Sequence, residues 1–349
     1  MQPLNVALVG YGYAGKTFHA PLISATPELK LAAVVSSRPD EVRADWPQVP
    51  VLAGLEQALL DPAIDMLVIA SPNRLHYPQA RSGLMAGKHV VVDKPFTVTQ
   101  AEARELCLMA ERPGSPLLSV FHNRRWDADF LALKALLAGG ELGALSHFES
   151  HFNRYRPQVR ARWREQDQPG AGLWYDLGPH LLDQALQLLG WPQTIYASLF
   201  KQRAGAQATD YFHVQLGYAE YQAVLHGSCL VSGGAPRFSL HGTLASYVKF
   251  GLDSQEDYLK HGGRPGETGW GVDLAPGVLF RQRDDGEMRE PRPSPLGDYC
   301  DFYRGVARAA QGLGSNPVTA REAWRVMALL EQGEQSAREG RRLFCLPVA

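Results

Sequence analysis

The sequence predicts two α/β domains: a doubly wound parallel sheet at the N-terminus, then a domain built on a mostly antiparallel sheet. The 349 residues exceed one ordinary domain and can bury two cores. Up to Phe121, short continuous apolar runs alternate with helical patterns, which is typical of parallel strands covered on both faces. After Gly190, segments of period two follow one another without long helices, which indicates antiparallel pairing.

The first domain contains five expected strands, each a short apolar run. They are Leu4–Val9, Leu31–Val35, Met66–Ala70, Val90–Val92 and Leu117–Phe121. The helices expected between and after these strands are Ala14–Ala25, Leu55–Leu60, Leu75–Ala86 and Gln100–Ala110. Thr99 precedes the last helix and can cap its free backbone amides. We expect the domain boundary at Phe121–Arg125, which gives domains of residues 1–122 and 123–349.

The second domain is expected to begin with helices at Asp127–Leu137 and Leu173–Leu188. Five strands should follow: Ile195–Lys201, Phe212–Tyr218, Ala223–Leu230, Phe238–His241 and Tyr247–Phe250. Residues 262–295 hold many glycines and prolines and are expected to be loop-rich. Helices at Asp298–Gln311 and Ala320–Arg338 should close the chain.

Composition narrows the classes of partner. With a net charge of -1, the protein has no overall positive field that would attract nucleic acid or an anionic membrane. Local basic clusters can still bind phosphate. The four cysteines show no zinc-like spacing, and no run approaches the ~18 apolar residues of a membrane span. We therefore expect a cytoplasmic protein with reduced thiols. His147 and His151 lie in a strand-like run without a third ligand, so no metal site is expected.

A glycine-rich loop follows the first expected strand. The segment Gly10-Tyr11-Gly12-Tyr13-Ala14-Gly15 fits the pattern G-x-G-x-x-G and opens a helix. In that setting the first glycine permits a tight turn, the second lets the backbone approach a pyrophosphate, and the third lets the helix pack on the strand. The loop predicts a Rossmann dinucleotide site; the alternative is a glycine-rich turn in an unrelated α/β fold. The candidate binding residues are Gly10, Gly12, Tyr13, Ala14 and Gly15.

The end of the second strand bears on the type of dinucleotide. A carboxylate about 20 residues after the glycines would bind the ribose of NAD. Here the sequence reads Ser36-Ser37-Arg38, and two hydroxyls with a guanidinium suit a 2′-phosphate. We therefore expect NADP as the cofactor. The alternative is that Arg38 is a solvated loop residue and that Asp40 or Glu41 reaches the ribose.

Two further strand ends carry candidate residues. Ser71-Pro72-Asn73, with His76, follows the third strand at the edge where such sheets bind ligands, or these residues only begin the next helix. Asp93-Lys94-Pro95 follows the fourth strand. Burial and a neighbouring cation both lower the pKa of a lysine, so Lys94 is a candidate acid–base group; the alternative is a surface lysine before a helix-breaking proline.

A polar pair lies in the second domain. Asp176 and His180 are four residues apart, so on one helix they share a face and can address the same substrate hydroxyl. Pro179 should disturb a helix interior, which suggests that the pair spans the first turn. The alternative is a capping Asp176 and a packed His180.

Together these motifs resemble the glucose–fructose oxidoreductase, inositol dehydrogenase and rhizopine-catabolism family (Gfo/Idh/MocA). The matching segments follow the family's order over nearly the whole chain: Gly10–Gly15, Ser71–Asn73 with His76, Asp93–Pro95, and Asp176-x-Gly178-x-His180. The stretches from Phe121 to Asp127, Asn153 to Pro157 and Ala161 to Arg164 look like the NADP-dependent scyllo-inositol dehydrogenase branch.

The resemblance implies a Rossmann domain followed by an α/β domain with an open, mostly antiparallel sheet, whose face often forms a dimer interface. It implies that Lys94, Asp176 and His180 are the catalytic group. It also implies that four residues approach the cofactor: Asn123, Trp163, Arg164 and Tyr299. Asp93 stands where the family usually has Glu, which keeps the charge and shortens its reach by one methylene.

The expected activity is NADP-dependent oxidation of a secondary alcohol on a cyclitol or sugar. Either His180 or Lys94 would accept the hydroxyl proton, and Asp176 would position the substrate. The candidate substrate-binding residues are Asn153, Tyr155, Arg156, Arg162 and Asp176; alternatively, the arginines of 154–164 form a solvated basic loop. Two rivals remain: an oxidoreductase of another keto-sugar, anhydrosugar or trans-diol, and a non-catalytic NADP-sensing regulator.

Overall fold

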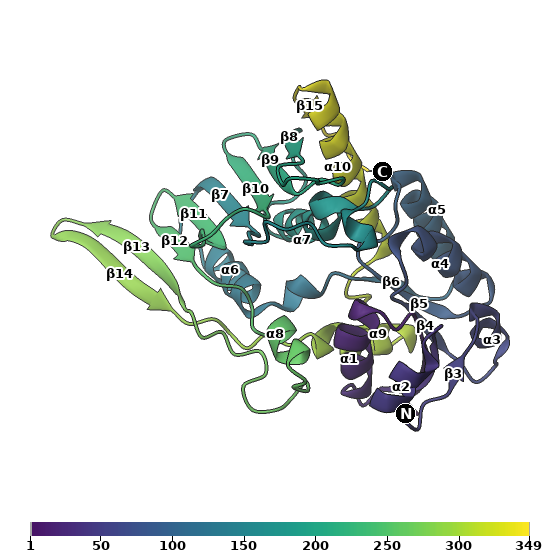
Figure 1. Cartoon of the computed structure of the whole chain (residues 1–349). Coiled ribbons are helices and arrows are strands. Elements are labelled where there is room, and N and C mark those ends of the chain that lie inside the picture. The colour runs from purple at the N-terminus through teal and green to yellow at the C-terminus, as the bar shows by residue number, and fades with distance from the viewer. Residues whose placement is uncertain (1, 349) are drawn as a thin grey trace. The chain divides into compact units, whose positions relative to one another are not determined.

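The computed structural model describes residues 2–348, which form two compact units (Figure 1). Of these residues, unit 1 consists of 2–126, 255–270 and 298–324, and unit 2 of 127–254, 271–297 and 325–348. Each unit therefore takes residues from both halves of the chain. No helix of the described residues is long and apolar enough to cross a membrane.

Unit 1 is built on a six-stranded parallel sheet with the order β3-β2-β1-β4-β5-β6. Its strands are β1 Leu4–Val9, β2 Leu29–Val35, β3 Val51–Leu52, β4 Met66–Ile69, β5 His89–Asp93 and β6 Leu118–Phe121. The apolar side chains of β1, β4 and β5 are almost completely buried, because helices cover both faces of the sheet. The predicted doubly wound domain is confirmed.

The helices of unit 1 lie on both faces of this sheet (Figure 1). They are α1 Ala20–Ser24, α2 Pro39–Asp45, α3 Leu55–Leu60, α4 His76–Met85, α5 Gln100–Ala110, α8 Gln255–Lys260 and α9 Cys300–Ala310. The first helix departs from the prediction, because Gly15–His19 forms a π-helical turn before α1. Thr99 caps α5 as expected: its hydroxyl accepts the backbone N–H of Glu102 at 3.2 Å.

Unit 2 is built on a nine-stranded sheet with the order β14-β13-β12-β11-β7-β10-β9-β8-β15. All neighbours pair antiparallel except β7 and β10. The strands are β7 Leu145–His151, β8 Thr194–Phe200, β9 Tyr211–Gly217, β10 Gln222–Ser228, β11 Phe238–Gly242, β12 Ser246–Lys249, β13 Gly277–Arg283, β14 Gly286–Arg292 and β15 Leu343–Phe344. The mostly antiparallel sheet is confirmed.

Residues 262–295, which we expected to be loop-rich, also contain two strands that the sequence did not reveal. β13 and β14 form a long hairpin that extends the sheet at one edge (Figure 1). Their alternating buried and exposed residues are mixed with glycines and prolines, which concealed the period of two.

Helices cover one face of the sheet in unit 2. α7 Gly172–Leu189 packs on β9 and β10, and α6 Ala128–Ala138 packs beside α7. Alternate strand residues point to that face and are fully buried, including Phe148, Phe212 and Leu240. The intervening residues on the opposite face of β7 and β9 are half-buried, as is His226 of β10, and several of them are histidines.

Candidate active site

Two of the three loop glycines are required by the fold of unit 1 itself. Gly10 has a φ of +101°, and a Cβ there would lie 2.8 Å from the carbonyl oxygen of Ala70. A Cβ at Gly15 would collide with the carbonyl oxygen of Gly10. The loop after β1 therefore packs tightly against Ala70, the residue that follows β4.

Gly12 has no such packing reason. The nearest atom to a Cβ added there is a guanidinium nitrogen of Arg38, at 4.0 Å. The glycine therefore leaves open space beside the loop. The loop lies between β1 and β4, where the chain stops adding strands on one side of β1 and continues on the other. This arrangement fits the close approach of a dinucleotide pyrophosphate. Beside it, Ala14 precedes the π-helical turn, and half-exposed Tyr13 donates its hydroxyl to Glu256 at 2.9 Å.

Arg38 turns back from the end of β2 toward the glycine loop. Its guanidinium donates to the carbonyl oxygen of Tyr11 at 2.6 Å and pairs with Glu41 at 3.1 Å. Its backbone N–H donates to the Ser36 hydroxyl at 3.0 Å, and Ser37 lies between the two. The competing acids are engaged, since Glu41 pairs with Arg38 and Asp40 with Arg43. The end of β2 therefore carries a guanidinium and two serine hydroxyls, and the nearby carboxylates are held in ion pairs.

His76 joins the loops that follow β4 and β5. One ring nitrogen lies 2.9 Å from the carbonyl oxygen of Ser71 and the other 2.8 Å from that of Pro95. The imidazole ring of His76 is buried. Asn73 is buried as well, and it begins a short 3-10 turn directly after Pro72. Both His76 nitrogens thus face backbone carbonyls, which fixes the Ser71 loop relative to the turn that carries Lys94.

Lys94 follows a buried carboxylate at the end of β5. Asp93 accepts the backbone N–H of Lys94 at 2.9 Å, and its Oδ1 lies 3.7 Å from Nε2 of His19. Burial by itself would raise the pKa of Asp93, but the hydrogen bond and charge of His19, together with Lys94 and His76, hold that pKa below its usual value. The carboxylate stays ionised beside the backbone of Lys94.

A tyrosine from the far end of the chain completes this buried network. The Nδ1 atom of His19 lies 2.6 Å from the hydroxyl of Tyr303 in α9, although 284 residues separate them. Burial raises the pKa of Tyr303 well above its ordinary value, with the charge of Asp93 adding to the effect. His19 and Tyr303 escaped sequence reasoning because neither stands in a motif.

The remaining predicted cofactor residues of unit 1 are buried. Asn123 begins a short 3-10 segment directly after β6. Tyr299 is fully buried at the start of α9, where its backbone N–H donates to Gln255 at 2.7 Å and its ring contacts Phe18 and Trp270.

In unit 2, Asp176 and His180 lie on α7, one turn apart. The helix begins at Gly172, so the pair lies beyond the first turn and Pro179 sits inside the helix. The expectation that the pair spans the first turn is wrong, and Asp176 is not the capping residue, a position that Ala171 takes. His180 is buried, while Asp176 lies 3.9 Å from Arg154 and reaches a pocket.

The glycines of the α7 motif are set by packing. A Cβ at Gly178 would lie 2.5 Å from the ring of Trp174, and Gly172 has a φ of +87° with Thr209 against it. Trp174 is buried, and its indole N–H donates to the carbonyl oxygen of Leu330 at 3.0 Å. These contacts fix the helix on which Asp176 and His180 stand.

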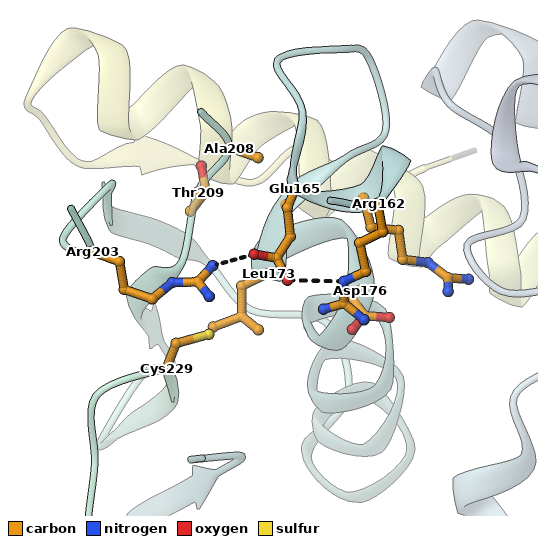
Figure 2. A pocket seen from close by; sticks show the side chains of 10 residues that line it. Arg162, Glu165, Leu173, Asp176, Arg203, Ala208, Thr209 and Cys229 are labelled. Carbon is orange, nitrogen blue, oxygen red and sulfur yellow. Dashed lines mark hydrogen bonds and ion pairs between the residues drawn. The ribbon is translucent and has the colours of Figure 1, made fainter. Parts of the chain in front are cut away.

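A small pocket, partly open to solvent, lies beside the start of α7 (Figure 2). Its lining residues are Arg162, Arg164, Glu165, Gly172, Leu173, Asp176, Arg203, Ala208, Thr209 and Cys229. Figure 2 shows Glu165 between Arg162 and Arg203, which it binds at 2.9 and 3.1 Å. Trp163 packs under the guanidinium of Arg164, with 4.8 Å to the ring centroid.

Three other predicted substrate residues precede this pocket in the chain. Arg156 is half-buried, with its backbone N–H donated to the carbonyl oxygen of Cys229 at 2.7 Å, whereas Tyr155 is largely exposed. The Oδ1 atom of Asn153 is buried and has no hydrogen-bond partner among residues 2–348. Such an atom normally has a donor, and a ligand hydroxyl is one that fits.

His147 and His151 both bind Glu149 at 2.8 Å in β7. Within the described part of the chain, no group of three or more His, Cys, Asp or Glu side chains could hold a metal ion.

A doubly wound sheet with a glycine loop at its switch point, followed by an α/β domain, defines the class of two-domain dinucleotide-binding oxidoreductases. Residues 4–122 match the family model described as "Oxidoreductase family, NAD-binding Rossmann fold", and residues 134–346 match "Oxidoreductase family, C-terminal alpha/beta domain". The chain belongs to the Gfo/Idh/MocA oxidoreductase family, and it is an NAD(P)-dependent dehydrogenase.

Three relatives illustrate this membership. The chain is 51% identical to the uncharacterized oxidoreductase YdgJ of Escherichia coli, over 98% of this chain and 99% of that protein. It is 39% identical to the scyllo-inositol 2-dehydrogenase (NADP(+)) IolW of Bacillus subtilis, over 98% and 96%. A solved structure, the putative oxidoreductase YPO2259 of Yersinia pestis, has 50% identity and a TM-score of 0.95, over 100% of this chain and 99% of that chain.

Proposed function

We propose that this dehydrogenase uses NADP and transfers a hydride between the nicotinamide and a secondary alcohol or ketone of a cyclitol or sugar, with scyllo-inositol as the model substrate. The observation that carries the proposal is the lysine-bearing turn at the end of β5, held by a buried carboxylate on the same sheet edge as the glycine loop. The name of the relative IolW supports the cyclitol and NADP.

The residues of unit 1 fit the cofactor in three groups. Gly10, Gly12, Tyr13, Ala14 and Gly15 would hold the pyrophosphate, and Ser36, Ser37 and Arg38 the 2′-phosphate. Ser71, Pro72, Asn73, His76, Asp93, Lys94, Asn123 and Tyr299 would serve the nicotinamide half, with Trp163 and Arg164 added from unit 2. His76 and Asp93 act in this proposal by positioning, because both bind the backbone beside Lys94. We further propose residues 1–122 as the NADP-binding domain and residues 123–349 as the domain for substrate binding and oligomerisation.

Proton transfer is assigned to Lys94, Asp176 and His180. When NADP is bound it supplies reversible hydride chemistry. Either Lys94 or His180 accepts the proton of the reacting hydroxyl, and the other donates a hydrogen bond to the same oxygen. Asp176, one turn before His180 on α7, binds substrate hydroxyls and stabilises a charged His180.

Substrate recognition is assigned to Asn153, Tyr155, Arg156, Arg162 and Asp176. The unsatisfied Oδ1 atom of Asn153 and the carboxylate of Asp176 can accept hydrogen bonds from hydroxyls. A polyol with several hydroxyls would satisfy such acceptors, whereas a deoxy analogue would leave them unpaired.

The Lys94→Met variant tests the proposal. NADP reduction is measured with a panel of inositols and sugars at alkaline pH, and NADP binding is measured separately by fluorescence titration. We expect binding to persist and kcat to fall by roughly a hundredfold or more, the usual contribution of a positioned acid–base group. Near-normal turnover in Lys94→Met would refute the role of Lys94, and no turnover of any polyol by the wild-type protein would refute the substrate class.

We also propose a homo-oligomer, a dimer or larger, that forms through the half-buried face of the sheet in unit 2. This face includes His147, His151, His213 and His226, which are half-buried. A second copy would cover it.

A further inference from the structure

A buried row of polar side chains lies behind the end of β5 in unit 1. The hydroxyl of Tyr303 in α9 lies 2.6 Å from Nδ1 of His19, and Nε2 of His19 lies 3.7 Å from Oδ1 of Asp93. Tyr303 and His19 are fully buried, and Asp93 is almost so. Asp93 in turn accepts the backbone N–H of Lys94 at 2.9 Å. The row therefore ends at the residue to which we assign proton transfer.

The π-helical turn Gly15–His19 brings His19 to this place. The turn directly follows the glycine loop, and turns of this kind are rare and occur frequently at functional sites. The imidazole packs against Phe121 at the end of β6, with 4.6 Å between the ring centroids. Phe121 also packs against the ring of Tyr303, at 5.7 Å. These contacts hold the imidazole between its two polar neighbours.

The two neighbours of His19 favour one tautomer of its ring. An ionised carboxylate only accepts hydrogen bonds, so the nitrogen that faces Asp93 is best protonated, and this nitrogen is Nε2. The hydroxyl of Tyr303 then donates to the lone pair on Nδ1. The distance of 3.7 Å from Nε2 to Asp93 exceeds that of a hydrogen bond, and Nε2 has no hydrogen-bond partner among residues 2–348. The attraction between His19 and Asp93 is therefore electrostatic, in a buried site where screening by water is weak.

The titratable groups that act on Asp93 and on Tyr303 come from several elements. They are His19, His76, Lys94 and Cys300. Burial raises the pKa of the Cys300 thiol to about 12 and that of Tyr303 well above its ordinary value, so both stay neutral. Burial would also raise the pKa of Asp93, and of the groups that lower it instead, His19 has the largest effect. The charge on Asp93 therefore depends on His19 first.

We propose that His19 and Tyr303 are positioning residues for the dehydrogenase reaction. Tyr303 fixes the ring of His19. His19 orients Asp93, whose carboxylate holds the backbone of Lys94. The inference rests on the proposed role of Lys94 in proton transfer, and it adds two residues whose complete burial keeps them from substrate and cofactor. Loss of the pairing loosens the turn that carries Lys94, which slows the chemical step and leaves cofactor binding intact.

Two substitutions at His19 separate its two contacts in the full-length enzyme. The side-chain amide of Gln reaches about as far as Nε2 of histidine, whereas that of Asn reaches only about as far as Nδ1. His19→Gln can still donate to Asp93 and should keep kcat within about threefold of the wild-type value. His19→Asn leaves Asp93 without a donor and should lower kcat by roughly tenfold to a hundredfold, the range of a hydrogen bond to a charged group. The Kd for NADP should change by less than about threefold in both variants.

Tyr303→Phe removes one hydroxyl and keeps the packed ring. We expect kcat to fall by roughly threefold to tenfold. The acid limb of the pH profile of kcat should move to higher pH, because the pKa of Asp93 rises when His19 is no longer fixed beside it, and a change of packing alone would not move this limb. Tyr247→Phe is the matched control: it removes a buried hydroxyl of β12 that has no hydrogen-bond partner among residues 2–348, and it should change neither quantity. Circular dichroism and melting temperature check the folding of each variant.

A spectroscopic readout separates this inference from the proposed function. ¹⁵N NMR of histidine-labelled protein distinguishes the two tautomers without any turnover, and the signal of His19 is assigned by its loss in His19→Gln. We expect His19 of the wild-type protein to carry a proton on Nε2. A proton on Nδ1 alone would overturn the inference. Normal kcat and an unshifted pH profile in both His19→Asn and Tyr303→Phe would also overturn it while the dehydrogenase stands. Near-normal turnover in Lys94→Met would instead remove the proposed function, and the NMR signal then tests the pairing by itself.

Discussion

At the scale of residues, the glycine loop shows how one motif serves two purposes. Gly10 and Gly15 are needed because any side chain there would strike the backbone of the protein. Gly12 faces open space bordered only by Arg38, so packing does not require a glycine there. Arg38 thus lies beside the glycine at which we propose that the cofactor phosphates approach.

Arg38→Ala should lower kcat/KM with NADP by roughly tenfold to a hundredfold and leave kcat/KM with NAD nearly unchanged. The expected loss is that of one charge-assisted contact to the 2′-phosphate. Arg43→Ala, at an exposed arginine that pairs with Asp40 on the same helix, is the control. Steady-state kinetics with both cofactors make the measurement; equal losses with NAD and NADP would remove the 2′-phosphate assignment.

At the scale of elements, α7 is held by a tryptophan fitted between two helices. A Cβ at Gly178 of α7 would lie 2.5 Å from the ring of Trp174, and one at Gly333 of α10 (Ala320–Glu339) would lie 2.9 Å from it. The Gly178 in the motif Asp-x-Gly-x-His is therefore explained by packing of the helix, whereas Asp176 and His180 belong to the proposed catalytic group.

Gly178→Ala should lower the free energy of unfolding by about 1–3 kcal/mol, the usual cost of an added methyl in a filled core. Trp174→Phe provides the smaller ring, and the double variant should cost less than the sum of the two single variants, since the clash is then relieved. Urea unfolding of all four proteins measures the coupling. Strictly additive effects would show that the ring and the methyl do not meet.

At the scale of the whole molecule, one face of the sheet in unit 2 gathers ionisable rings. His226 lies among His151, His213 and Tyr211, with ring centroids 5.4, 5.6 and 5.1 Å away. Burial lowers the pKa of His226 to about 4, and repulsion from His151 and His213 contributes to this shift as the smaller cause. Burial lowers the pKa of His213 as well. Glu149 faces the same cluster with a pKa below its usual value: burial would raise it, but His147 and His151 lower it.

This cluster predicts a loss of stability in mild acid. A histidine with a lowered folded pKa binds more protons when unfolded, so its contribution is complete above about pH 6.5 and is lost as the pH falls toward 4. His226→Gln should reduce that pH dependence of the free energy of unfolding, whereas His261→Gln, at an exposed histidine, should not. Urea unfolding across this range measures it, and sedimentation velocity shows whether self-association declines in step. An unaltered pH dependence in His226→Gln would contradict the assignment.

Much of the framework follows from local pattern. Runs such as Met66–Ile69 are apolar without alternation because both faces of the sheet are covered, so strand type can be read from the sequence. Short or polar elements were missed, among them α2, α8 and the β13–β14 hairpin, because their local signals are weak and their stability comes from contacts distant in the chain.

The sequence by itself determined the doubly wound and antiparallel sheets, the family, and the candidate residues that stand in motifs. These depend on periodicity and on turn chemistry within a few residues, which any local window contains. Only the tertiary structure decided that His19 lies between Asp93 and Tyr303 and that Glu165 is shared by two arginines. The physical reason is that charge pairing and burial depend on segments brought together by the hydrophobic cores, and their separation along the chain leaves no local trace.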